Sequence, residues 1–191
     1  MSRPTVDFVL TFVLLIRNNQ RGFIKSILFT ALSLTISASS SAQNNSIMKS
    51  INNNAPVKCS KSITINASCE KVWEVMTNID SWATWQTDIS KPKLNGVLKP
   101  ETTFDWKTGG AKIHSTLHTV DPNKHFGWTG TTFGMFAIHN WTLTDFKGQT
   151  KVSVDESMEG FFAMLFQKSF NKNLEKGMQN WLNLLKQECE N

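Results

Sequence analysis

The sequence contains no tyrosine, only three cysteines and, after residue 42, no arginine. Three cysteines cannot form a complete disulfide framework, although Cys59 and Cys69 could pair with each other and leave Cys189 free. From Gln43 onward the chain has 16 lysines and 14 acidic residues, a nearly balanced charge. Because this part of the chain has no arginine, it lacks the guanidinium groups that bind phosphates and base edges through paired hydrogen bonds. We expect no nucleic-acid partner.

Motifs for several kinds of chemistry are also missing. The sequence has neither a glycine-rich phosphate loop nor a Gly-x-Ser-x-Gly motif, and no histidine lies close to a cysteine along the chain. His114 and His118 have the spacing of a helical metal site, but they fall in an expected strand, where four residues span about 13 Å. We expect these two histidines to face solvent, and we expect no metal and no cofactor.

The N-terminal segment, residues 1–42, has the pattern of a signal peptide. Its first apolar run, 8–16, is too short to span a bilayer as a helix, and a second run, 27–36, precedes the small residues 38–42. Cleavage before Gln43 would make the protein periplasmic or secreted, without a stable membrane span. The two runs suggest that the true translation start lies further along the chain. The alternative is an uncleaved segment that anchors the protein in the membrane.

Residues 43–56 are polar and rich in asparagine, which predicts a flexible tether before a single domain at 57–191. The alternation over 57–66 predicts a strand with one buried face. A helix is expected over 69–77, capped by residues 66–68, and Asp80 is expected to cap a short turn. Further strands are expected over 91–94, 103–107, 112–120, 125–129, 135–146 and 150–158.

The last segment, 161–189, is expected to form one long amphipathic helix. Gly177 lies beside its apolar stripe, where glycine costs about 1 kcal/mol relative to alanine. This glycine either allows a sheet or a ligand to come close or has no special role. The stripe recurs at steps of three and four and consists of Phe162, Phe166, Phe170, Leu174, Met178, Trp181 and Leu185. Together these elements predict an α+β domain in which the helix lies across one face of five or six antiparallel strands.

Several segments resemble the polyketide cyclase/dehydrase branch of the START-like superfamily, also called SRPBCC. They are Ile63–Met76, Ile79–Trp85, Val120–Pro122, Phe126–Gly130, Ile138–Trp141, Glu156–Gly160 and the final helix. The resemblance covers 57–190 and implies the helix-grip (Bet v 1-like) fold, in which a sheet wraps around a long C-terminal helix and encloses an apolar cavity. Similar proteins include lipid carriers, plant hormone receptors and aromatic cyclases.

A tight turn at Lys147 and Gly148 would bring a histidine and a carboxylate together. If these two are the turn residues, His139 lies opposite Glu156 on the neighbouring strand, about 5 Å away between Cβ atoms. The same register also places two apolar pairs opposite each other, Leu143 with Val152 and Trp141 with Val154. The pair could orient a bound ligand, stabilise the cavity wall, or act as acid and base on an enolisable ligand.

The seven tryptophans exceed what a small core needs and indicate a cavity for a hydrophobic ligand. Phe133, between two glycines, could gate that cavity or belong to an ordinary hairpin. We therefore expect an exported protein that binds a lipid, polyketide or aromatic molecule. The alternatives are a cyclase or dehydratase that uses His139 and Glu156, and an envelope protein with a filled core and a protein partner. The expected ligand-binding residues are Trp106, Trp128, His139, Trp141, Glu156, Phe170, Leu174 and Met178.

Overall fold

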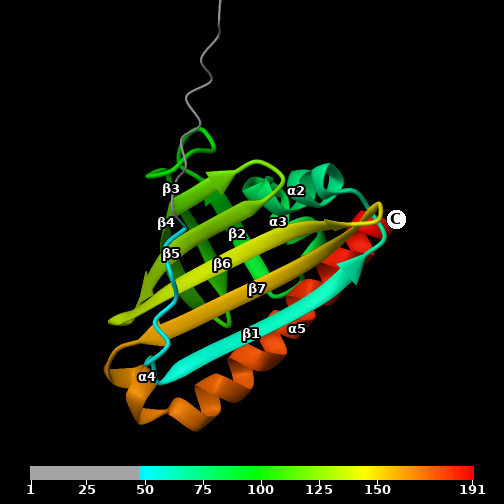
Figure 1. Ribbon diagram of the computed structural model, residues 1–191. Coiled ribbons are helices and arrows are strands. Elements are labelled where there is room, and N and C mark those ends of the chain that lie inside the picture. The colour runs from blue at the N-terminus through cyan, green and yellow to red at the C-terminus, as the bar shows by residue number, and fades with distance from the viewer. Residues whose placement is uncertain (1–47) are drawn as a thin grey trace, which may run out of the picture. The chain divides into compact units, whose positions relative to one another are not determined.

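The computed structural model describes residues 48–191, and the predicted signal peptide lies outside this range. Seven antiparallel strands form one sheet in the order β1-β7-β6-β5-β4-β3-β2, and the long helix α5 lies along it (Figure 1). The predicted α+β class is confirmed, and the sheet has seven strands, one for each strand segment expected from the sequence, rather than five or six. The strands are β1 (Val57–Ile65), β2 (Ile89–Leu94), β3 (Thr103–Thr108), β4 (Ala111–Asp121), β5 (His125–Thr132), β6 (Met135–Phe146) and β7 (Gln149–Glu159). The helices are α2 (Cys69–Thr77), the 3₁₀ turn η1 (Ile79–Ser81), α3 (Trp82–Trp85), α4 (Phe161–Leu165) and α5 (Gln167–Glu190).

The turn between β6 and β7 sets the register that the sequence predicts. Lys147 and Gly148 have φ values of 55° and 81°, the left-handed conformation of a two-residue hairpin turn. His139 consequently lies opposite Glu156. Because side chains alternate along a strand, this local turn also decides which residues of both strands face the interior.

Two side chains fix the short helices near the start of the domain. The Ser68 hydroxyl accepts a hydrogen bond from the backbone N–H of Lys71 at 3.3 Å and caps α2 as predicted. The prediction that Asp80 caps the next turn is wrong. Its carboxylate instead accepts hydrogen bonds from the backbone N–H of Leu94 at 2.6 Å and from the Lys93 ammonium at 2.7 Å. Asp80 therefore ties η1 to β2.

The core lies at the end of the sheet that α2, α3 and the second half of α5 cover. Trp82 is 1% exposed and packs edge-to-face against Phe104 and Trp181, with ring centroids 5.6 and 5.2 Å away. Its indole N–H donates to the carbonyl of Met76 at 2.9 Å, so its only polar atom is satisfied. This cluster closes one end of the space between helix and sheet.

The final helix is not continuous, as the sequence predicts it to be, but breaks at Phe166. The φ and ψ values of this residue, −111° and 29°, separate α4 from α5. Phe162 and Phe166 are 43% and 50% exposed, although Trp181 and Leu185 on the same predicted stripe are buried. The reason is position: α4 begins just after β7 ends, so among the side chains of α4 only Ala163 is covered.

Part of the predicted tether lies against the outer face of the sheet (Figure 1). The Asn140 amide donates to the carbonyl of Lys49 at 2.8 Å, and the backbone N–H of Asn52 donates to the Ser157 hydroxyl at 3.0 Å. These contacts hold the segment on β6 and β7 before it enters β1. The segment makes both contacts with its backbone rather than with asparagine side chains, so Lys49 and Asn52 are held on the sheet.

The three cysteines are all free, so the possible Cys59–Cys69 disulfide is not formed. Burial raises the pKa of the Cys189 thiol to about 12. Within residues 48–191 no helix is both long and apolar enough to cross a bilayer. Residues 48–191 contain every element above and their own core, which is what a domain needs in order to fold alone.

Candidate functional site: a cavity between the sheet and α5

A cavity of about 270 Å³ lies between the inner face of the sheet and the first two-thirds of α5. Strands β3 to β7 and the segment before β2 form its other walls. Cavities of about 150 Å³ hold benzene in other proteins, so this space suits a molecule of roughly two fused rings. Its apolar lining includes Trp106, Trp128, Met135, Met158, Phe170 and Leu174.

Seven of the eight residues expected at the ligand lie at this cavity, and Trp141 does not. Trp141 is 2% exposed and packs in the core against Trp181, with ring centroids 5.4 Å apart. It shares the inner face of β6 with His139 but lies two residues further toward the closed end. Trp181, which is not among the eight expected residues, also lines the cavity, and its position three residues after Met178 on the same helix face is the sequence signal for it.

Gly177 lines the cavity, and a Cβ at this position would meet nothing within 4 Å. Gly177 is itself exposed, so the space beside it is open and no strand packs closely against it. The structure shows no close approach of the sheet at this glycine, so a ligand beside it and no special role are the two explanations that stay open.

His139 and Glu156 form a buried pair in the cavity wall. The His139 Nδ1 lies 2.5 Å from a Glu156 carboxylate oxygen, and the two side chains are 8% and 10% exposed. The imidazole also stacks on Trp128 at 4.3 Å, with only 9° between the ring planes. An ionised carboxylate can only accept, so with an ionised Glu156 this hydrogen bond requires a proton on Nδ1 of His139. In a neutral imidazole of this tautomer, Nε2 carries a lone pair whose direction the contact with Glu156 fixes.

Two buried polar atoms at the cavity have no hydrogen-bond partner among the described residues: Nε2 of His139 and Nε1 of Trp181. The rings that carry them are close, with centroids 5.7 Å apart. By contrast, the indole N–H of Trp106 donates to the Ser115 hydroxyl at 3.0 Å. Buried polar groups are normally hydrogen-bonded, so the first two are the atoms in the described residues around the cavity whose hydrogen-bonding capacity the protein leaves unused.

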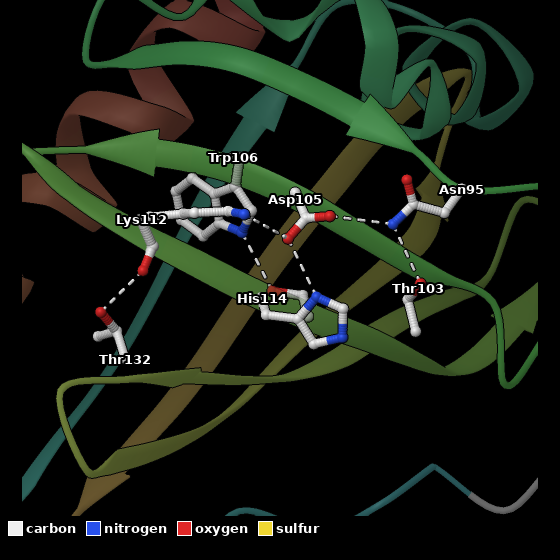
Figure 2. Close-up of polar contacts among 8 residues, drawn as sticks. Asn95, Thr103, Asp105, Trp106, Lys112, His114 and Thr132 are labelled. Carbon is white, nitrogen blue, oxygen red and sulfur yellow. Dashed lines mark hydrogen bonds and ion pairs between the residues drawn. The ribbon is translucent and has the colours of Figure 1, made fainter.

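A second histidine–carboxylate pair, on the outer face of the sheet, is a surface feature. Figure 2 shows His114 and Asp105 on adjacent strands, with Asn95 at the other carboxylate oxygen of Asp105. The His114 Nδ1 lies 3.0 Å from the first carboxylate oxygen. The His114 side chain is 54% exposed, as predicted. Hydrogen bonds from His114 and Asn95 lower the pKa of Asp105.

His118, also predicted to face solvent, is half-buried instead. Burial disfavours its charged form and, together with the Lys49 charge, lowers its pKa to about 4. No three histidine, cysteine or carboxylate side chains within residues 48–191 are grouped so that they could hold a metal ion.

Comparison with known proteins identifies the family. The sequence profile described as "Polyketide cyclase / dehydrase and lipid transport" matches residues 56–190. The chain belongs to this family. The resemblance drawn from the sequence motifs is thereby confirmed, and the match begins where the segment on the outer face ends and β1 is about to start. No curated protein matches this polyketide cyclase/dehydrase family member in sequence.

Solved structures share the fold of this family member. A hypothetical protein from Helicobacter pylori has a TM-score of 0.66 and 17% identity, over 74% of this chain and 97% of its own. An aromatase/cyclase from Streptomyces has a TM-score of 0.62 and 13% identity, over 70% of this chain and 93% of its own. A protein from Thermus thermophilus has a TM-score of 0.61 and 13% identity, over 69% and 96%. At these identities the likeness shows the helix-grip fold alone.

Proposed function

We propose that the protein is an exported binding protein for a small hydrophobic molecule that carries a hydroxyl group. The observation that carries this proposal is the buried Nε2 of His139, which has no hydrogen-bond partner among the described residues while Nδ1 of the same ring is held by Glu156 at 2.5 Å. Membership of a family that includes lipid transport, together with a cavity of about 270 Å³, supports a hydrophobic ligand. The filled-core alternative does not agree with a cavity of this size.

A hydroxyl group matches the two unpartnered atoms at the cavity wall. It can donate its hydrogen to His139 Nε2 and accept a hydrogen bond from the Trp181 indole N–H. An ether or ketone could only accept, and a hydrocarbon could do neither. The rest of the ligand would lie against apolar surfaces such as Trp128, so that one polar group sets its orientation and burial supplies most of the affinity.

The proposal can be tested with two probes that differ by one hydroxyl group, 2-naphthol and naphthalene. Equilibrium dialysis against residues 43–191 is expected to show that 2-naphthol binds about tenfold more tightly than naphthalene. His139→Phe should abolish this preference and still bind naphthalene. His114→Phe, on the outer face, is the matched control and should keep the preference. Equal affinity of the unaltered protein for both probes, or no binding of either, would contradict the proposal.

A second candidate function, supported by the 2.5 Å contact between His139 and Glu156, is acid–base catalysis. In that reaction His139 Nε2 would take a proton from the ligand, and Glu156 would stabilise the resulting imidazolium. Chemical change of a bound polyketide-like compound, followed by mass spectrometry and lost in Glu156→Gln, would establish catalysis. A compound recovered unchanged leaves the protein as a carrier.

Export is supported by the signal-peptide pattern of residues 1–42. N-terminal sequencing of the protein from its own cells is expected to begin at Gln43. A mature protein that begins earlier would support the membrane-anchored alternative.

A further inference from the structure

A patch of large apolar side chains is exposed on α4. A small domain normally exposes such side chains singly, and a cluster on one element usually marks a contact surface. We call this cluster the α4 patch. Its members, 43% to 66% exposed, are Phe161, Phe162, Met164, Leu165 and Phe166.

The turn between β5 and β6 extends the α4 patch. Phe133, at the tip of this turn, is 71% exposed. Gly160, which begins α4, lies so close to the backbone of Gly134 that a Cβ on Gly160 would be 2.6 Å from the Gly134 carbonyl oxygen. Both features therefore lie at the same end of the sheet, opposite the end that α2 covers (Figure 1).

A row of aromatic rings runs from the α4 patch to the cavity. Phe162 stacks on Phe166 at 6.4 Å, and Phe166 meets Phe170 edge-to-face at 6.3 Å. Phe170 itself lines the cavity. The exposed apolar surface is thus continuous with the wall of the binding site.

The surroundings of the α4 patch carry positive charge. The first turns of α5 present Lys168 and Lys172 to solvent, four residues apart. The nearby Glu175 is paired with Lys61 at 2.9 Å, which neutralises its charge. Glu159, at the end of β7, is the other acidic residue from 159 to 176. An apolar surface beside exposed lysines complements an anionic lipid surface.

We propose that the α4 patch inserts into the surface of a bilayer that contains anionic lipids. The helix is apolar on nearly every side, with only Ala163 packed inward. A protein groove would cover one face of such a helix, whereas the headgroup and acyl region surrounds it from all directions. If the proposed function holds, the hydrophobic ligand then enters the cavity from the lipid along Phe162, Phe166 and Phe170.

Vesicle sedimentation of residues 43–191, without added ligand, tests the docking step independently of the cavity. The protein is expected to sediment with vesicles of three parts phosphatidylcholine to one part phosphatidylglycerol, and more weakly with phosphatidylcholine alone. Phe162→Ser with Phe166→Ser should weaken binding at least about tenfold. A second variant, Met164→Ser with Leu165→Ser, also changes only exposed positions and should weaken binding in the same way. It provides the test if the first variant folds poorly. Phe146→Ser, an exposed phenylalanine at the opposite end of the sheet, is the matched control and should not change binding.

The charge contribution has its own pair of variants. Lys168→Glu with Lys172→Glu should reduce binding to the anionic vesicles and leave the weaker binding to neutral vesicles unchanged. Lys151→Glu, exposed on β7 near the other end of the sheet, should have a much smaller effect. Binding of the Lys168→Glu, Lys172→Glu variant to the anionic vesicles should also depend less on salt concentration than binding of the unaltered protein does.

Two results would overturn the docking proposal: unaltered protein that does not sediment with anionic vesicles, and α4 variants that sediment as well as it does. Sedimentation velocity without lipid could give a third contrary result. If the unaltered protein is a dimer and the Phe162→Ser, Phe166→Ser variant is a monomer, a second copy of the chain covers the α4 patch. None of these results depends on 2-naphthol binding, so failure of docking and failure of the proposed function remain distinguishable.

Discussion

The two ends of the C-terminal apolar stripe have the same periodicity and opposite surroundings. Near its end, Trp181 and Leu185 are at most 8% exposed, on the part of α5 that packs against the sheet and α2. At its beginning, Phe162 and Phe166 are about half exposed, because the strands end before α4 starts. Periodicity therefore identifies which residues share a side of a helix, and the position of the sheet decides whether that side is a core or a free surface.

The largest expected difference is in stability, and it is tested by the same substitution in each half. Leu182 is fully buried and Leu165 is 59% exposed. Leu182→Ala should lower the free energy of unfolding by about 2–5 kcal/mol, since it leaves a cavity in the core. Leu165→Ala should change it by about 0.5 kcal/mol or less. Urea unfolding of residues 43–191 measures both, and equal losses would mean that α4 is packed against something.

A larger side chain at the middle of α5 should affect binding rather than stability. Gly177 faces open cavity space, so Gly177→Met would place its side chain where the ligand lies. We expect at least about tenfold weaker binding of 2-naphthol, with unfolding changed by about 1 kcal/mol or less. Gln187→Met, at an exposed position of the same helix, is the matched control. Unchanged affinity in Gly177→Met would place the ligand elsewhere.

The smallest expected effect is a gain in stability at the same position. Gly177→Ala adds a methyl group that meets no atom within 4 Å, and alanine is the better helix former. The free energy of unfolding should rise by about 0.5–1 kcal/mol. Thermal unfolding measures the change. A decrease would show that the helix relies on the glycine for a close approach absent from this structure.

Local sequence patterns predicted the strands and helices of the fold and the pairing of His139 with Glu156. The hairpin turn at Lys147 and Gly148 determines the register by itself, so the pairing of His139 with Glu156 could be derived without any long-range information. The cap at Ser68 is equally local. These features depend on residues a few positions apart, and the sequence contains all of them.

The features that the sequence did not predict depend on what lies nearby in space. Trp141 has the same alternation as His139, but the closed end of the sheet makes it part of the core. Asp80 has the sequence position of a helix cap, but its carboxylate accepts a hydrogen bond from the backbone N–H of Leu94 on β2 instead. The asparagines before β1 show no periodicity, yet the backbone of Asn52 meets Ser157 on the sheet. No local pattern records such neighbours.

The most direct test of the proposed function is native mass spectrometry of the mature protein, purified gently from its own cells, followed by extraction and identification of any bound compound. We predict one equivalent of a small apolar molecule with a hydroxyl group, lost from His139→Phe and retained by His114→Phe. A mass that matches the bare polypeptide, with no compound extracted and no binding of 2-naphthol afterwards, would contradict the binding function.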